Sequence, residues 1–278
     1  MSVFIPVSRQ SIQGLTNEIN TDLTYQNRGY PIGINFTLLS RLEGGSSPYA
    51  NVPLSNEEIR RATERKRQIA EAITSNPQKA LELQRQENRE PNRSGVTIGS
   101  GYDLGQTSVA EMRQLGLPDS IIRKCAPYIG KKRMDAIDLL RSRPLILTGT
   151  EIDTVNRAIM TDKARKCIFS WDNRITELRK TNPNAPYFHE MSSNQQTVVF
   201  SRYYHEGQGW AGNRHNQPIY DAMTRNNWKT VERHWRALLL DKTPPKKMQE
   251  RISGHKYWPG WKADRFKNEL DILNKDFR

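Results

Sequence analysis

The sequence has few cysteines and no long apolar run, and both absences restrict the class of protein. Cys125 and Cys167 are its two cysteines, too few for a disulfide scaffold, and no C-x-x-C metal spacing occurs. We expect free buried thiols, with pairing in an oxidising compartment as the alternative. No apolar stretch approaches the roughly 20 residues of a transmembrane helix, so we predict no membrane span.

Repeats, low-complexity tracts and a secretory signal are also absent. The first residues, Met1–Pro6, lack the basic-then-apolar layout of a signal peptide. We therefore expect synthesis in the cytoplasm and, for a target outside it, delivery by another route. The histidines show no zinc spacing, so the sequence predicts neither a metal site nor a cofactor.

Positive charge is what the chain has in excess, with a net charge of +13 over 278 residues. A basic surface favours an anionic partner, such as nucleic acid, an acidic membrane or an acidic polymer like the bacterial cell wall; a merely soluble surface is the alternative. The basic residues are dispersed among acidic ones, apart from short clusters such as Lys131–Arg133. Because a nucleic-acid-binding arm is usually more concentrated, we expect no nucleic-acid partner.

Helical patterns dominate the chain. Phe36, Leu38, Leu39 and Leu42 form an apolar stripe at helical spacing, which the glycine pair at 44–45 ends. Capping boxes open three more predicted helices, at Ser55–Glu58, Thr148–Glu151 and Ser192–Gln195. The last precedes the broadly apolar residues 198–204, which we predict to be the central buried helix.

A short β-hairpin is predicted where Val96 and Ile98 alternate with glycines. The fold class is therefore α+β, mainly helical with a small sheet in the N-terminal part. Residues 1–33 are interpreted as a lead-in segment, either packed on the domain or serving as a docking tail, and 34–278 as one domain. Residues from about 55 to 88 form a charged helical insertion with too few apolar positions for a core.

Glu43 is the first candidate for chemistry because it directly follows the predicted helix. A carboxyl at a helix C-terminus feels the negative end of the helix dipole, and the apolar Leu42 partly desolvates it. Both effects raise the pKa of Glu43, as a general acid working near neutral pH requires. Its position alone favours the interpretation of Glu43 as an ordinary surface glutamate, whereas the downstream hairpin favours its role as the general acid.

The segment Ser94–Gln106 carries the stronger signal. Gly99 and Gly101 leave a strand without side-chain bulk, so a ligand or another backbone can approach closely. Thr97 offers a hydroxyl and Asp103 a carboxylate just past the glycines. A dinucleotide-binding loop is excluded, because its pattern needs a glycine at position 104, which is leucine.

Two motifs, Glu43 with its glycine pair and the Thr-Ile-Gly-x-Gly run that starts at Thr97, resemble the catalytic core of phage-type lysozymes. The similarity is closest to the branch that includes the lysozyme-like domains of bacterial toxins such as pesticin, and it extends loosely over residues 35–274. The resemblance implies an N-acetylmuramidase that cleaves the β-1,4 bond between N-acetylmuramic acid and N-acetylglucosamine. Glu43 would protonate the leaving oxygen, and Thr97 with a carboxylate would position water for inversion.

The chain departs from that pattern at the second carboxylate. The short phage enzymes have an aspartate between the glutamate and the threonine. Counted forward from Glu43, the matching position of this chain holds Asn51; counted back from Thr97, it holds Pro91, with Glu90 beside it. Asp103 is the first choice for the water-activating carboxylate because it lies within the motif. Glu90 is the second, while Asn51 can orient a water but cannot act as a base.

The remaining predictions concern substrate contacts and partners. The predicted substrate-binding residues are Tyr49, Gly99, Gly101, Tyr102, His205 and Glu206. Near the last two, Tyr204 or Trp210 either packs on a sugar ring or is an ordinary core aromatic. We expect a monomer that acts on peptidoglycan in the periplasm or cell wall of a target cell, as a delivered antibacterial toxin or effector with an immunity protein in the producer. Alternatives are a phage endolysin, a non-catalytic cell-wall-binding domain and a nucleic-acid-binding protein.

Overall fold

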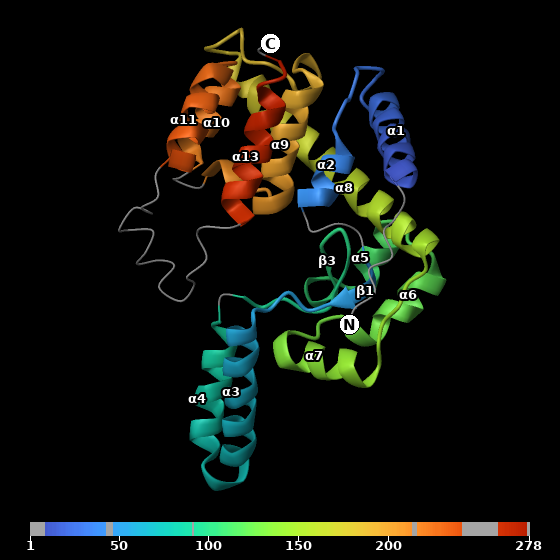
Figure 1. Cartoon of the computed structure of the whole chain (residues 1–278), viewed down its shortest axis with the longest axis vertical. Helices are drawn as coiled ribbons and strands as arrows, with labels where there is room; N and C mark the ends of the chain where they lie inside the picture. The colour runs from blue at the N-terminus through green and yellow to red at the C-terminus, as the bar shows by residue number, and fades with distance from the viewer. Residues whose placement is uncertain (1–8, 43–46, 91, 213–215, 241–260, 277–278) are drawn as a thin grey trace. The chain divides into compact units, whose positions relative to one another are not determined.

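The computed structural model describes residues 9–42, 47–90, 92–212, 216–240 and 261–276 (Figure 1). They form two compact units: unit 1 is the described part of Met1–Ser11 with Glu43–Ile159, and unit 2 that of Ile12–Leu42 with Met160–Arg278. Helices dominate both, and a three-stranded antiparallel sheet lies in unit 1. The predicted mainly helical α+β class is confirmed.

Unit 1 has a core between its small sheet and several short helices. Val96 and Ile98 of the hairpin, Met112, Ile121 and Val155 are buried in it. The elements of unit 1 are β1 (Ser47–Asn51), α3 (Asn56–Ser75), α4 (Pro77–Asn88), β2 (Thr97–Gly99), β3 (Tyr102–Asp103), α5 (Val109–Gln114), α6 (Asp119–Cys125), α7 (Arg133–Ser142) and the first part of α8 (Gly149–Leu178).

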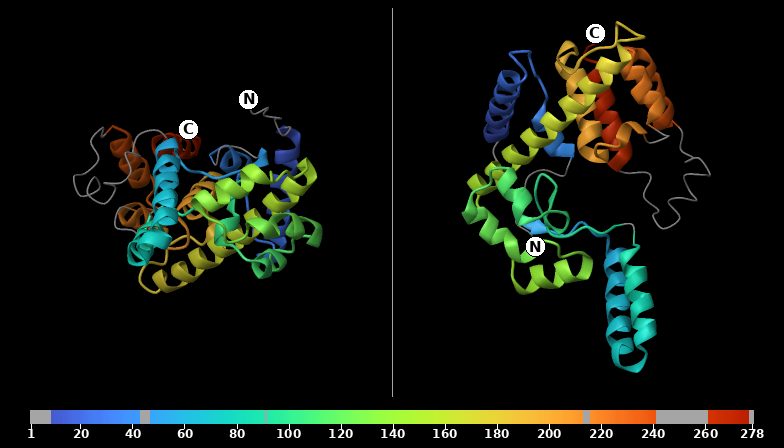
Figure 2. Two further views of the ribbon diagram at one scale, coloured as in Figure 1. Left: turned by 90° about the horizontal axis from the view of Figure 1, so that it is seen from below. Right: turned by 180° about the vertical axis from the view of Figure 1, so that it is seen from behind.

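Helices α3 and α4 lie side by side, joined at Asn76 (Figures 1 and 2). The predicted capping box starts α3: the Ser55 hydroxyl accepts from Glu58 N–H (3.2 Å), and the Glu58 carboxylate accepts from Ser55 N–H (2.7 Å). Asn76 caps α4, and Pro77 fits its first position because proline has no N–H to leave unsatisfied there. Local sequence thus determines both helices.

The α3–α4 pair is anchored to helix α7 of unit 1. Ala62 packs with Met134 and Ile137 of α7 in a small cluster of its own. Lys66 Nζ of α3 lies 2.8 Å from Asp135 and 2.9 Å from Asp138, both also on α7. The apolar contacts of the pair are few, as the sequence predicted, and ion pairs add to them.

Unit 2 is built around α9 (Ser193–Glu206), in which every residue from Gln196 to Tyr204 is buried. The predicted central buried helix is therefore confirmed, with its capping box between Ser192 and Gln195. The other elements are α1 (Arg9–Gln26), α2 (Phe36–Leu42), the remainder of α8, α10 (Gln217–Thr224), α11 (Trp228–Leu240) and α13 (Trp261–Leu273). Helix α1 contributes Leu15, Ile19 and Leu23 to the same core, so most of the predicted lead-in segment packs on unit 2.

A buried ionic network joins α9 to α13. Arg202 Nε lies 3.3 Å from the Glu269 carboxylate, and the Ser201 hydroxyl donates to the other oxygen of Glu269 (2.5 Å). Arg265 Nη1 donates to the Ser201 carbonyl (3.2 Å). Removing one member of such a network would leave a buried charge without its partner, so these contacts link the two helices.

The structure bears on two further predictions, the state of the cysteines and the lack of a membrane span. Cys125 and Cys167 are free and buried, one in the core of unit 1 and the other in that of unit 2. Burial raises the pKa of Cys125 to about 12, which keeps that thiol protonated. Across the described parts of the chain, no helix is long and apolar enough to span a membrane.

Removing α3 and α4 tests how far the fold of unit 1 depends on them. Replacing residues 56–88 by a short Gly/Ser linker should leave a cooperative thermal transition, because the main core of unit 1 contains no residue of either helix. The melting temperature should fall by a few degrees, since the Ala62 contacts and the Lys66 ion pairs are lost. Circular dichroism checks both; loss of the folded state would show that the two helices are required for the small sheet.

Candidate functional site

The register of the small sheet brings three of the candidate residues into one row. Asn51 of β1 lies opposite Thr97 of β2, and Thr97 lies opposite Asp103 of β3. Directly opposite residues project from the same face of a sheet, with Cβ atoms about 4.5–5.5 Å apart. Asn51, Thr97 and Asp103 therefore share a face, although the sequence separates the first two by the whole of α3 and α4.

This row faces away from the core of unit 1. The next residue of β2, Ile98, pairs with Tyr102 and is buried in that core. Since side chains alternate along a strand, Thr97 projects from the opposite face. The Thr97 hydroxyl is buried and has no hydrogen-bond partner among the described residues, whereas Asn51 is exposed. Asn51 thus offers an amide to a ligand on this face, and the enclosed Thr97 hydroxyl lacks the partner that a bound water would supply.

Asp103 holds the hairpin together. Its Oδ1 accepts from Gly95 N–H (2.9 Å) and from Gly105 N–H (2.8 Å). Burial raises the pKa of Asp103, and the two N–H groups and the charge of Lys132 oppose that rise. The carboxyl is therefore a base whose strength depends on its packing as well as on its hydrogen bonds.

Gly95 and Gly105 are required by close backbone packing. A Cβ on Gly105 would lie 2.7 Å from Gly95 Cα and 2.8 Å from the Lys131 carbonyl oxygen, distances that real side chains do not adopt. Gly95 also forms a β-bridge with Lys132, and Gly130 N–H donates to the Leu104 carbonyl (3.0 Å). The hairpin and the segment before α7 thus form one packed framework.

The glycines of the hairpin turn have a structural reason as well. Gly99 has φ +55° and Gly101 φ +93°, the left-handed region that favours glycine. A Cβ on Gly99 would collide with the side-chain oxygen of Asn156 on α8. That oxygen accepts from Ser100 N–H (2.8 Å), so Asn156, itself buried, holds the turn. Substrate binding by Gly99 and Gly101 stays a prediction.

The remaining candidates of unit 1 are less well placed. Tyr102 projects from the core-facing side of β3, and its hydroxyl bonds to the Thr107 hydroxyl (2.7 Å), which favours a structural role. Glu90 forms a 3.7 Å ion pair with Arg65 of α3. Glu43 lies outside the described residues and follows helix α2 (Phe36–Leu42) in the sequence. Tyr49 belongs to β1, and the structure does not describe its side chain.

The candidates at the end of α9 lie in unit 2. Glu206 is ion-paired with the buried Arg202 (3.1 Å) and accepts from the Asn216 side chain. Trp210 is buried in the core, edge-on to Tyr220, which agrees with the interpretation as a core aromatic. Tyr204 is also buried, beneath Lys163 Nζ at 3.8 Å from its ring centroid. His205 and Glu206 as substrate contacts stay predictions.

Comparison with known proteins identifies the family. Residues 73–229, more than half of the chain, match the profile described as a bacterial toxin homologue of phage lysozyme, C-terminal part. The chain belongs to the pesticin family. The match includes Thr97, Asp103 and Asn156 and begins after Glu43. Membership makes this pesticin-family protein a lysozyme-like toxin whose class of activity is the degradation of peptidoglycan. No curated protein matches the chain.

Two residues that position the site differ in how visible they are in the sequence. Lys132 lies in the charged cluster Lys131–Arg133, so composition marks it. Asn156 occupies one polar position in a helix with Ile152, Val155 and Ile159 on its buried face, and no sequence signal distinguishes it. Within the described residues, no group of histidine, cysteine, aspartate and glutamate side chains is arranged to hold a metal ion.

Asn156→Ala tests whether α8 holds the turn. The substitution removes the buried acceptor of Ser100 N–H, which should cost about 1–3 kcal/mol of unfolding free energy and loosen the strand that carries Thr97. Urea unfolding and hydrolysis of purified peptidoglycan measure the two effects. Asn173→Ala, at an exposed position on the same helix, is the matched control. Equal stability and activity of the two variants would show that the turn does not need Asn156.

Proposed function

We propose that this pesticin-family protein is an N-acetylmuramidase that hydrolyses the β-1,4 bond between N-acetylmuramic acid and N-acetylglucosamine. The observation that carries the proposal is the row of Asn51, Thr97 and Asp103 on the outward face of the sheet, within a fold related to phage lysozyme. Such a row offers a base, a hydroxyl and an amide to one water.

In the proposed reaction, Glu43 protonates the glycosidic oxygen as the bond breaks. Asp103 accepts a proton from the attacking water, and the Thr97 hydroxyl holds that water on the opposite side of the ring, so the anomeric centre is inverted. The buried Thr97 hydroxyl lacks a partner among the described residues and would be satisfied by a bound water, which supports its role. No metal or cofactor takes part in these steps.

A delivered antibacterial toxin or effector is the proposed setting, with an immunity protein in the producing cell. The toxin description of the family supports it over a phage endolysin. A wall-binding domain without catalysis is the rival function; it would have no use for a carboxylate raised in pKa beside an unpaired hydroxyl. Mass analysis of digested peptidoglycan identifies the cleaved bond, because a muramidase leaves N-acetylmuramic acid at the new reducing end.

Glu43→Gln keeps the size of the side chain and removes the proton. Hydrolysis of purified peptidoglycan should fall at least about 100-fold in kcat, since general acid catalysis contributes about 10²–10⁴-fold. The exposed Glu82→Gln on α4 is the control and should retain wild-type activity. Near wild-type clearance by Glu43→Gln, with a normal melting temperature, would remove Glu43 from the mechanism.

Asp103→Asn and Glu90→Gln distinguish the two candidates for the base. Asparagine still accepts the two N–H groups, so Asp103→Asn should fold and lose most of kcat, while Glu90→Gln loses little. Because burial raises the pKa of Asp103 and a base must be ionised, kcat/KM should rise with pH through a value above the ordinary aspartate pKa of about 3.9. Equal, mild losses in both variants would leave water activation to Thr97 and backbone groups.

A further inference from the structure

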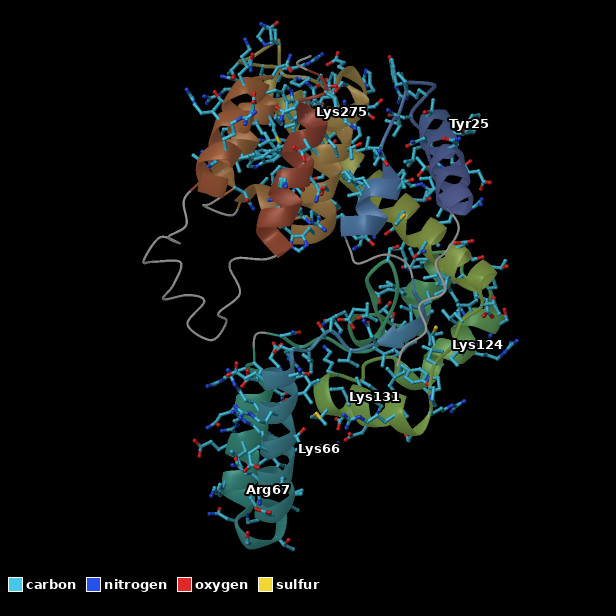
Figure 3. All side chains as sticks on the ribbon, in the orientation of Figure 1. Tyr25, Lys66, Arg67, Lys124, Lys131 and Lys275 are labelled. Carbon is cyan, nitrogen blue, oxygen red and sulfur yellow. The ribbon has the colours of Figure 1, made fainter. Side chains whose placement is uncertain are left out.

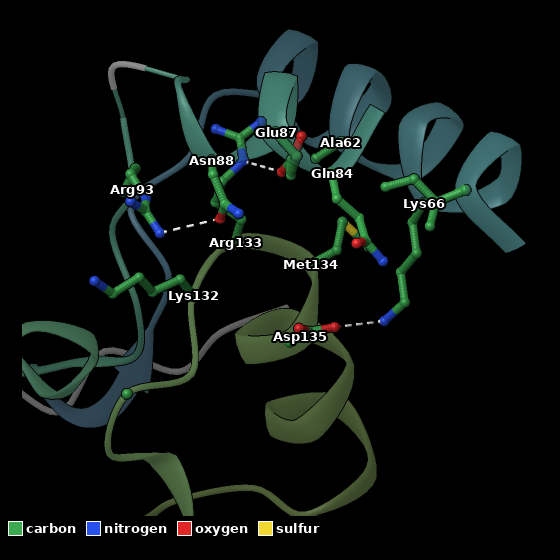
Figure 4. Close-up of a pocket in the computed structure, with 12 residues that line it drawn as sticks. Ala62, Lys66, Gln84, Glu87, Asn88, Arg93, Lys132, Arg133, Met134 and Asp135 are labelled. Carbon is green, nitrogen blue, oxygen red and sulfur yellow. Dashed lines mark hydrogen bonds and ion pairs between the residues drawn. The ribbon is translucent and has the colours of Figure 1, made fainter. Parts of the chain in front are cut away.

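A cavity of about 460 Å³ lies in unit 1 between the α3–α4 pair and the start of α7. Figure 4 shows Arg93 and Lys132 towards one end of it, and Lys66 with Asp135 towards the other. Glu87 and Arg133 lie between these ends, and Ala62 and Met134 add apolar surface. Apart from Lys132, whose charge lowers the pKa of Asp103, none of these side chains takes part in the proposed mechanism.

The lining carries more positive than negative charge. Four basic side chains, Lys66, Arg93, Lys132 and Arg133, face two acidic ones, Glu87 and Asp135. Lys66 is neutralised by Asp135 and Asp138, and Arg133 by Glu87. The Lys132 ammonium makes no hydrogen bond and no ion pair among the described residues, although its charge acts on Asp103, so it can bind a ligand. Basic residues elsewhere in unit 1, such as Arg67, Lys124 and Lys131, are dispersed over its surface (Figure 3).

One acceptor of a lining residue lies behind the cavity wall. Glu87 Oε1 pairs with Arg133, while Glu87 Oε2 is buried and has no hydrogen-bond partner among the described residues. Because Oε2 has no accessible surface, a ligand does not reach it, and the cavity presents the Lys132 and Arg93 cations to an anionic group.

The backbone of Arg133 adopts a conformation that is unfavourable for its residue type. Its backbone has φ +50°, which is uncommon for a residue other than glycine, and its side chain is buried. The guanidinium also donates to the Asn92 carbonyl (2.6 Å). Residues fixed in such conformations concentrate at functional sites, because the surrounding structure must over-determine them.

The cavity is coupled to the hairpin through the backbone. Lys132 forms a β-bridge with Gly95, and Arg133 N–H donates to the Ser94 carbonyl (2.9 Å). Gly95 is the residue whose N–H Asp103 accepts. The wall of the cavity and the strand that carries Thr97 are thus parts of one framework, close enough for one polymer to reach both.

We propose that this cavity binds the peptide stem of peptidoglycan, with a stem carboxylate on Lys132 and Arg93. The proposal rests on the proposed function, because the stem is attached to the muramic acid of the chain that is cut. A stem carries free carboxylates, so it complements the excess positive charge of the lining.

Direct binding tests the site independently of catalysis. A synthetic stem tripeptide with free carboxylates and a side-chain amine is titrated by calorimetry into the full chain. Lys132→Gln should weaken binding about tenfold, the effect of one lost charge-assisted hydrogen bond, and Arg93→Gln should weaken it as well. The control is Lys131→Gln, the same charge change at the exposed neighbouring residue, and it should bind like the wild type. No binding by the wild type, or equal losses in all three variants, overturns the proposal.

Hydrolysis provides the second measurement. The wild type should have a lower KM on intact peptidoglycan than on glycan stripped of its stems by an amidase, and Arg93→Gln and Lys132→Gln should lose this preference. Lys132 also acts on Asp103, so a loss in Lys132→Gln alone, equal on both substrates, assigns it to Asp103 and overturns the stem role. If the full chain binds a DNA oligonucleotide as tightly as the stem peptide, the cavity is a general anion site, and this outcome also overturns the proposal. If no glycan is cut at all, the proposed function fails, while the peptide titration still decides the site.

Discussion

One carboxylate oxygen, Asp103 Oδ1, organises the hairpin on which the candidate site depends. It accepts the N–H groups of Gly95 and Gly105, and this draws two glycines together where no Cβ would fit between them. The row from Asn51 through Thr97 to Asp103 exists because this closure fixes the register of the strands. From the other side, Asn156 of α8 holds the turn at Ser100, so the position of Thr97 is determined by contacts at both ends of its strand.

The structural role and the proposed catalytic role of Asp103 make different demands on its pKa. As a structural acceptor it is stabilised in its ionised form by two N–H groups, while burial favours its neutral form and raises its pKa. A water-activating base needs to be ionised at the working pH and still basic enough to take a proton. Asp103 makes both hairpin hydrogen bonds through Oδ1, and its other oxygen lies outside those bonds. One carboxylate can therefore stabilise the hairpin and still accept a proton.

The charged α3–α4 pair is joined to the rest of unit 1 through ion pairs as well as through apolar contact. Lys66 bridges to two aspartates of α7, and Arg133 bridges to Glu87, around a small apolar cluster centred on Ala62. Such an attachment leaves a polar cavity where an apolar interface would close. A surface helix pair therefore adds a binding wall beside the sheet without becoming part of the main core.

Local sequence determined the helices and the hairpin of this protein: Ser55, Thr148 and Ser192 begin helices through their capping boxes, and the glycines at 99 and 101 require a turn with positive φ. These are short-range effects of hydrogen bonding and backbone sterics, so a pattern along the chain reveals them. Only the tertiary structure decided that Asn51 meets Thr97 across the sheet, that Asn156 supports the turn and that Lys132 stands unpaired beside a buried Glu87 oxygen. Those relations depend on packing between segments far apart in sequence, where burial and the choice of partner, and not the residue type, determine what a side chain does.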